Sequence, residues 1–188
     1  MIEVEIRAKI KDLEKVKQNL LEKGAKSLGV KRQVDRIFGH QMFLDEDNLI
    51  IEGGLSARIR TENGKCFLEL KEIVRQGGGV EVKSALSGEN MGKRILEKLK
   101  FEETFTISKE RELFSLDDFE ICLDNVEKLG MFIEIEKMIG SLENEYIARK
   151  ECVELLENLS PGAEIENRKY GDLMQELIDR EKKIPWQH

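Results

Sequence analysis

The nonapeptide Ile2-Glu3-Val4-Glu5-Ile6-Arg7-Ala8-Lys9-Ile10 alternates apolar and charged residues at every position. Successive side chains of a β-strand point to opposite faces, so this period of two predicts a strand with one buried and one charged face. Residues 12–24 then change to a helical spacing, with Asp12 as a candidate N-cap and Gly24 as a candidate C-terminal stop. The chain is therefore expected to open with a strand and an amphipathic helix.

The same reasoning extends along the chain. Asn63-Gly64 separates two alternating runs and is the strongest short-range hairpin signal. A weak echo relates residues 20–23 (LLEK) to 95–98 (ILEK), and it predicts one domain, 1–188, of two pseudo-repeated halves, about 1–85 and 86–188; chance similarity is the alternative. Further strands are expected at 33–39, 55–61, 66–71, 80–85, 104–114, 119–124 and 131–137, and helices at 87–99, 141–159 and 170–181.

Composition excludes several classes of protein. The 188 residues carry a net charge of −7, which argues against a nucleic-acid-binding or membrane-surface protein held by bulk positive charge. Stretches without a formal charge reach only about six residues, so no transmembrane helix is expected, and the N-terminus lacks the apolar core of a signal peptide. Three cysteines without a C-x-x-C pair indicate reduced thiols and a cytoplasmic location.

Charged side chains recur on one face of about eight predicted strands. A solvated sheet face is one interpretation. The other is an antiparallel sheet closed into a barrel, with its charges inside and helices over its apolar side, since closed barrels can hold a polar interior. Inward charges must then be solvated, paired or bound to an ion. The residues concerned are Glu3, Glu5, Arg7, Lys9, Arg58, Arg60, Glu69, Lys71, Glu81, Lys83, Lys109, Arg111, Glu120, Asp124, Glu134 and Glu136.

Two Glu-x-Glu pairs give this pattern a chemical meaning. Glu3 with Glu5, and Glu134 with Glu136, each place two carboxylates on one strand face, about 6.5–7 Å apart. Clustered carboxylates suit hard cations such as Mg²⁺ or Mn²⁺. Arginine and lysine on neighbouring strands suit phosphoryl oxygens. The residues alone therefore predict a metal–polyphosphate site.

Two motifs carry a resemblance to a known family. The opening run 3–7 (EVEIR) is similar to an E-x-E-x-K signature, and residues 123–136 (LDNVEKLGMFIEIE) are similar to an L-D-x-V-x-x-L-G-x-F-x-E-I-E run. Residues 33–38, 57–60, 68–71 and Lys169-Tyr170 extend the match over nearly the whole chain. The sequence thus resembles the CYTH superfamily of triphosphate tunnel metalloenzymes, which includes class IV adenylyl cyclases and thiamine triphosphatases.

This resemblance implies an α+β fold in which an eight-stranded antiparallel closed barrel, the triphosphate tunnel, has helices packed outside. It implies Mg²⁺ or Mn²⁺ as cofactor and a class IV adenylyl cyclase that converts ATP to cyclic AMP and pyrophosphate. A thiamine or inorganic triphosphatase is the alternative, and a non-catalytic nucleotide or polyphosphate sensor is a third candidate. The partner is a nucleoside triphosphate or another triphosphate, and a homodimer stays open. The implied metal ligands are Glu3, Glu5, Asp124, Glu134 and Glu136; the implied triphosphate-binding residues are Arg7, Lys9, Arg58, Arg60, Lys71, Lys109 and Arg111, with Arg7 and Lys71 catalytic and Glu81 on the acidic side.

Three departures from the family pattern bear on the reaction. Arg7 replaces the signature lysine, which keeps the charge and loses the proton-transfer chemistry of an amine. Lys83 stands where a second acidic residue often follows Glu81. Ile37 and Phe114 occupy positions where tyrosines are common, which weakens the case for a tyrosine that activates water or stacks on a base.

Overall fold

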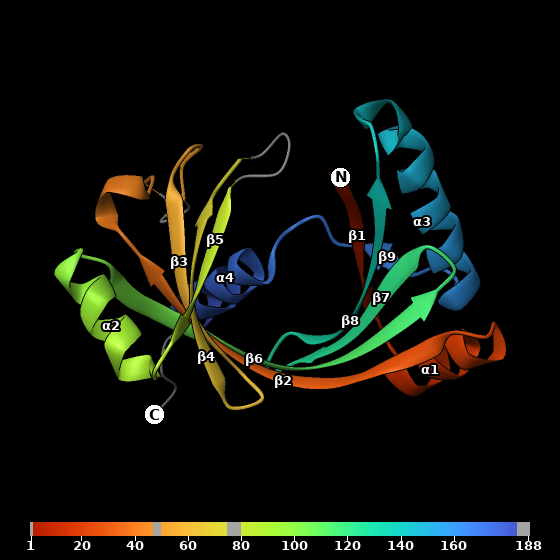
Figure 1. Ribbon diagram of the computed structural model, residues 1–188, viewed down its shortest axis with the longest axis horizontal. Helices are drawn as coiled ribbons and strands as arrows, with labels where there is room; N and C mark the ends of the chain where they lie inside the picture. Colours follow the sequence, from red (N-terminus) through yellow and green to blue (C-terminus); the bar gives the residue numbers. More distant parts are fainter. Residues whose placement is uncertain (1, 47–49, 75–79, 184–188) are drawn as a thin grey trace. The chain divides into compact units, whose positions relative to one another are not determined.

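The structure is a computed structural model that describes residues 2–46, 50–74 and 80–183 (Figure 1). Most of the predicted strands and helices are confirmed. The elements are β1 (Ile2–Ile10), α1 (Leu13–Glu22), β2 (Lys26–Gly39), η1 (Gln41–Phe43), β3 (Leu55–Glu62), β4 (Lys65–Glu72), β5 (Glu81–Leu86), α2 (Glu89–Lys98), β6 (Glu102–Leu116), β7 (Phe119–Val126), β8 (Gly130–Ile139), η2 (Leu142–Asn144), α3 (Glu145–Leu159), β9 (Glu164–Ile165) and α4 (Tyr170–Lys183).

Hydrogen bonds connect nine strands in the order β5-β4-β3-β2-β6-β7-β8-β1-β9. The expected closed barrel of eight strands is therefore wrong in two respects: there is a ninth strand, and the sheet is open, since no pairing joins β5 to β9 in the described residues. The physical reason lies at the edge of β1. Ala8 and Lys9 pair with Ile165 and Glu164 of β9, which occupies backbone groups on that edge of β1. The α+β class and the antiparallel pairing are confirmed.

The chain divides into two compact units. Unit 1 comprises residues 1–31 and 109–169, and unit 2 comprises 32–108 and 170–188, so β2 and β6 contribute to both. Apart from η1, the order strand–helix–strand–strand–strand occurs twice, as β1-α1-β2-β3-β4 and as β5-α2-β6-β7-β8. The first strand of each set pairs with the last strand of the other, β1 with β8 and β5 with β4. The two compact units have other boundaries than the predicted halves, about 1–85 and 86–188. The internal sequence repeat stays a prediction.

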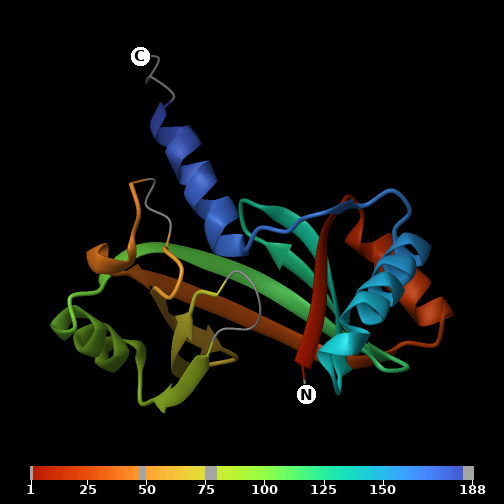
Figure 2. The ribbon, with the colours of Figure 1, turned by 90° about the horizontal axis from the view of Figure 1, so that it is seen from above.

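The core of unit 1 lies between the apolar face of its strands and two helices. Residues Ile6, Ala8 and Ile10 are buried, as the alternation in β1 requires. Helix α3 packs against β1, β8 and α1 (Figure 2). Asp12 caps α1, because its side chain accepts a hydrogen bond from the backbone N–H of Lys15. With its apolar side covered, the sheet in this unit keeps the charged residues on its other face.

Unit 2 has a separate core under α2, which lies against β3 and β4 (Figure 1). Phe38, Ala57, Ile59 and Leu96 are fully buried there. Gly92 is required by this packing, because a Cβ atom at that position would lie 2.6 Å from Leu86 Cδ1. The absence of a side chain at Gly92 therefore allows α2 to lie close to the sheet.

The predicted Asn-Gly hairpin is confirmed. Asn63 and Gly64 have φ values of 47° and 80°, the left-handed conformations that a tight turn between β3 and β4 needs. Strand β2 begins at Lys26, earlier than predicted. The prediction missed its first half because those residues are exposed and show no alternation. Among the described residues, no helix is long and apolar enough to cross a membrane.

Candidate functional site

In unit 1 the strand register places acidic and basic residues opposite one another. Arg7 of β1 stands opposite Glu134 of β8, and Glu5 stands opposite Glu136. In the neighbouring strand pair of the same sheet, Arg111 of β6 stands opposite Asp124 of β7. Because these positions alternate with the buried apolar residues, all of them lie on the charged face.

Arg7 is held by three groups. Its Nε donates to Glu134 Oε1 at 2.6 Å, its Nη2 donates to Glu5 Oε1 at 2.8 Å, and its Nη1 donates to the backbone oxygen of Arg168 at 2.9 Å. The other carboxylate oxygen of Glu134 accepts a hydrogen bond from Arg111. Glu134, whose side chain is 4% exposed, is thus neutralised by two guanidinium groups.

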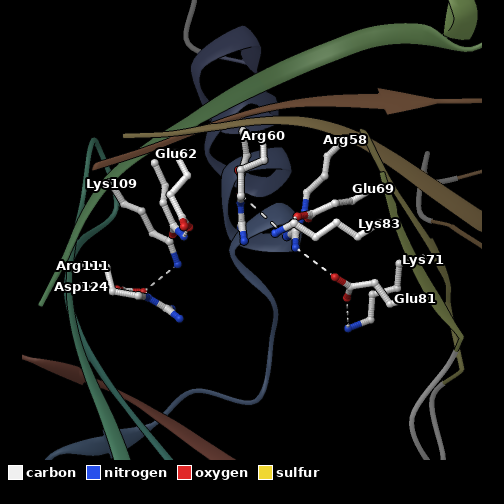
Figure 3. A network of polar contacts seen from close by, with 12 residues as sticks. Arg58, Arg60, Glu62, Glu69, Lys71, Glu81, Lys83, Lys109, Arg111 and Asp124 are labelled. Atoms are coloured by element: carbon white, nitrogen blue, oxygen red, sulfur yellow. Dashed lines mark hydrogen bonds and ion pairs between the residues drawn. The ribbon is translucent and has the colours of Figure 1, made fainter. Parts of the chain in front are cut away.

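Asp124 is fully buried and extends this ion-pair network through Arg111. Arg111 binds it in a bidentate manner, at 2.7 and 2.6 Å, and Lys109 Nζ lies 2.9 Å from its Oδ2 (Figure 3). Burial opposes ionisation of Asp124, but the hydrogen bonds from Arg111 and the charge of Lys109 hold its pKa below the usual value. Burial lowers the pKa of Lys109, against the charge of Asp124.

Glu3, Glu5 and Glu136 form an acidic cluster on the same face. A carboxylate oxygen of each lies within 4.8 Å of an oxygen of the other two, close enough for one cation to bind all three. Burial raises the pKa of Glu136 to about 7, and repulsion from Glu3, Glu134 and Glu5 adds to this effect. Burial likewise raises the pKa of Glu5, with Arg7 opposing. Arg7, which Glu5 shares with Glu134, therefore balances only part of the negative charge of the cluster.

Unit 2 also has a charged face, with more exposed cations. Asp35 of β2, which is buried, binds Arg60 of β3 through two hydrogen bonds of 2.6 Å. Buried Glu69 of β4 contacts Arg58 and lies 2.9 Å from Lys83 Nζ (Figure 3). Burial opposes ionisation of Glu69, but the hydrogen bond from Lys83 and the charge of Arg58 lower its pKa.

The lysines of unit 2 are the accessible part of this face. The side chains of Lys71 and Lys83 are 43% and 45% exposed. Lys71 lies 3.6 Å from Glu81, and Lys83 lies over the ring of Phe67, 4.3 Å from its centroid. Arg58 is 29% exposed and lies 3.6 Å from Glu81. An anion can therefore reach three positive groups, of which Arg58 and Lys83 are oriented by the buried carboxylate of Glu69.

The strand pairs of the two units differ in their charges. Asp35 on β2 pairs with Arg60 on β3, whereas Arg111 on β6 pairs with Asp124 on β7. Arg58 stands opposite Glu69, whereas Cys122 stands opposite Glu134. The unit 1 face therefore has an excess of carboxylates, and the unit 2 face is richer in cations.

The structure brings together some of the sequence-predicted residues and separates others. Of the five predicted metal ligands, Glu3, Glu5 and Glu136 converge, and Glu5, Asp124 and Glu134 each bind an arginine side chain. The predicted phosphate-binding cations lie on the charged faces: Arg7, Lys109 and Arg111 in ion pairs of unit 1, Lys9 near the ring of Phe132, and Arg58, Arg60 and Lys71 in unit 2.

Sequence reasoning placed Glu69 and Lys83 on the charged face without giving either a role in the site, and it did not place Asp35 there. Asp35 and Glu69 orient the arginines of unit 2, and Lys83 adds an accessible ammonium group. Glu69 was visible in the alternation of β4, but nothing in the sequence distinguished it from a solvated carboxylate. Asp35 shares the charged face with Gln33, which a two-residue period in β2 would have indicated.

A family model for the CYTH domain matches residues 1–170. The chain belongs to the CYTH domain family. This confirms the resemblance found in the two motifs at residues 3–7 and 123–136.

Known proteins agree with this membership. The chain is 34% identical over 165 residues to "Putative adenylate cyclase MJ0240" of Methanocaldococcus jannaschii, which covers 85% of this chain and 90% of the relative. Among solved structures, the conserved hypothetical protein Pfu-838710-001 from Pyrococcus furiosus is similar, with a TM-score of 0.72, 26% identity and coverage of 91% and 99%. HpAC1 from Hippeastrum, described as a "putative adenylyl cyclase" with a dominant triphosphatase activity, shares the fold at a TM-score of 0.62, 15% identity and coverage of 100% and 99%.

Proposed function

We propose that this CYTH protein is a metal-dependent enzyme that acts on triphosphates and converts ATP to cyclic AMP and pyrophosphate. The observation that carries the proposal is the cluster of Glu3, Glu5 and Glu136, whose oxygens lie within 4.8 Å of one another on a face that also holds Arg7. Hard divalent cations prefer such all-oxygen sites. Similarity to the archaeal protein named as an adenylate cyclase supports the cyclase reaction.

The donor set fits Mg²⁺ or Mn²⁺. Glu136 keeps a pKa of about 7 without a cation, so a divalent ion would relieve the repulsion that Glu3 and Glu5 exert on it. When bound, the cation would offset the negative charge of the triphosphate and polarise its phosphoryl oxygens. These three glutamates would hold it, and Glu134 and Asp124 would orient arginines.

Each charged face offers cations that would bind phosphates. Guanidinium groups present paired N–H donors that match phosphoryl oxygens, and buried carboxylates fix the orientation of Arg58 and Arg60. Cyclisation requires the ribose 3′-hydroxyl to attack the α-phosphorus and release its proton to water, while pyrophosphate leaves with the electron pair of the broken P–O bond. Arg7 stays protonated, so its role is to stabilise the charge that develops on phosphoryl oxygens. The ammonium group of Lys71, on the charged face of unit 2, suits the same role.

A second function, triphosphate hydrolysis, is favoured by a different observation. HpAC1, which shares the fold, is described as having a dominant triphosphatase activity. In that reaction water attacks the terminal phosphorus, and the same acidic cluster and arginines serve. The chain has Ile37 and Phe114 where the family commonly has tyrosines, which leaves the organic part of the substrate undetermined by those positions.

Product analysis separates these functions. The protein is incubated with ATP, thiamine triphosphate and inorganic triphosphate, each with Mg²⁺, with Mn²⁺ and with EDTA, and the products are separated by chromatography. Cyclic AMP and pyrophosphate identify a cyclase, whereas release of orthophosphate identifies a triphosphatase. Glu3→Gln should abolish turnover, and Glu154→Gln, which changes a carboxylate that is 62% exposed on α3, should not. Turnover in EDTA would refute the metal-dependent mechanism.

A further inference from the structure

Cys122 is a buried thiol on the charged face of unit 1. It is 0% exposed and stands directly opposite Glu134 in the pairing of β7 with β8. Its Sγ and carboxylate oxygens of Glu134 and Glu136 all lie within 4.8 Å of one another. In the part of the chain that the structure describes, no hydrogen bond to this thiol is found. A buried thiol without a partner is therefore directed at two carboxylates.

The other two cysteines have different surroundings. Cys152 is buried in the hydrophobic core with Leu156, and Cys66 on β4 packs with the hydrophobic core of unit 2. In the pairing of β3 with β4, by contrast, Arg58 stands opposite Glu69 and neutralises it. In unit 1, Arg7 and Arg111 neutralise Glu134, whereas Glu136 makes no ion pair within the described residues, so its charge is left for a ligand to balance.

We propose that Cys122, Glu134 and Glu136 form a site for a thiophilic divalent cation such as Zn²⁺, which overlaps the Mg²⁺ or Mn²⁺ site through the shared Glu136. This inference rests on the proposed metal site only in that shared residue. Thiolate sulfur favours Zn²⁺ and other soft ions, whereas carboxylate oxygen alone suits Mg²⁺ and Mn²⁺. As the Sγ–metal bond forms, the thiol releases its proton to water.

The geometry allows the three ligands to act together. The two oxygens of Glu134 accept from Arg7 and Arg111, and each oxygen keeps a further lone pair for a cation. Glu136 is more exposed than its two partners, so it is the side from which an ion enters. Glu136 belongs to both sites, and its carboxylate cannot bind a cation in each of them at full strength. Bound Zn²⁺ should therefore weaken Mn²⁺ binding.

Cd²⁺ serves as the probe, because a Cd²⁺–thiolate bond produces an ultraviolet charge-transfer absorption. Metal is first removed from the 188-residue protein with EDTA, and the EDTA is then removed by dialysis. Three forms are titrated with Cd²⁺: wild type, Cys122→Ser and the control Cys66→Ser. Wild type and Cys66→Ser should show the absorption at one equivalent. Cys122→Ser should lose it and bind Cd²⁺ at least about tenfold more weakly. Persistence of the band in Cys122→Ser, or its loss in Cys66→Ser, would overturn the proposal.

Two further measurements keep the test independent of folding and of the proposed function. X-ray absorption of Zn²⁺-loaded Cys66→Ser should show one sulfur at about 2.3 Å among oxygen ligands, and an all-oxygen shell would refute the site even if Cys122→Ser fails to fold. Electron paramagnetic resonance of Mn²⁺ tests the carboxylate site alone. If the wild type binds Mn²⁺ but shows no Cd²⁺–thiolate band, only this inference is refuted. If the wild type does not bind Mn²⁺, the proposed function is refuted.

Discussion

Replacing Glu136 by glutamine removes a negative charge that lowers the free energy of unfolding of the metal-free protein. Folding raises the pKa of Glu136 from 4.5 to about 7, because the side chain is partly buried beside Glu3, Glu134 and Glu5. Between these pH values the folded protein keeps a proton that the unfolded chain releases. The contribution of this group to stability therefore falls as the pH rises from 4.5 to about 7, and it stays low above pH 7.

The size of the effect follows from the shift. One pKa unit corresponds to about 1.4 kcal/mol, so the whole shift amounts to about 3 kcal/mol at pH 8. Glu136 is partly exposed, and screening by water reduces this to about 1–3 kcal/mol. In EDTA at pH 8, Glu136→Gln should thus raise the melting temperature by about 2–4 °C for each kcal/mol. Near pH 4.5 the advantage should vanish, because wild-type Glu136 is then protonated in the folded state.

Glu134→Gln is the matched comparison, and its expected effect has the opposite sign. Glu134 is buried and neutralises both Arg7 and Arg111. An amide at this position leaves two guanidinium groups with less compensation, which should lower the free energy of unfolding by about 3 kcal/mol. Two neighbouring carboxylates on one strand should therefore respond in opposite directions to the same substitution.

Thermal unfolding followed by circular dichroism at pH 4.5 and pH 8, in EDTA, measures both variants. The expected result is a stabilised Glu136→Gln at pH 8 only and a destabilised Glu134→Gln. If Glu136→Gln melts below the wild type at pH 8, Glu136 is a structural ion-pair partner and its assignment as a metal ligand is wrong. A gain that does not change with pH would refute the repulsion argument.

Three further predictions concern ligand binding and packing. Calorimetry should detect triphosphate binding with Mn²⁺ and not with EDTA, since the acidic cluster repels a polyanion; equal affinities would contradict the metal site. Lys71→Ala should lower triphosphate affinity at least about tenfold with little change in melting temperature, because its partner Glu81 is itself 39% exposed, whereas Arg94→Ala, exposed on α2, should change neither; a collapse in stability with affinity retained would assign Lys71 to folding. Gly92→Ala should lower the free energy of unfolding by about 1–3 kcal/mol in urea titration, because its methyl group would lie 2.6 Å from Leu86 Cδ1, and an unchanged midpoint would show that α2 can shift outward.

The strands were predictable where burial imposes alternation. Strand β1 follows its prediction from Ile2 to Ile10, since one face is buried along its length. The first half of β2 was missed because it buries nothing that would impose a period, and Gly29 there has a φ of 111°. Strand β9 was missed because two residues, Glu164 and Ile165, are too short to show any period. That short strand also helps explain why the predicted closure failed.

The candidate site was predictable in its chemistry and not in its pairing. The Glu-x-Glu motifs mark carboxylates on one strand face, but the register between β1 and β8 decides that Glu136 faces Glu5 while Glu134 faces Arg7. These strands are more than a hundred residues apart in sequence, and local patterns carry no information on such a register. The distinct roles of Glu134 and Glu136 therefore required the structure.

The arginines of both charged faces already have counterions within the protein. Arg7, Arg58, Arg60 and Arg111 each bind a carboxylate of the chain itself. An incoming phosphate must compete for these donors, and each exchange returns a buried carboxylate to a less favourable state. A ligand with one phosphate gains too little from such an exchange, whereas a chain of three phosphates makes several exchanges at once. The internal counterions thus act as a threshold that discriminates ligands by their number of charges, whatever organic group they carry.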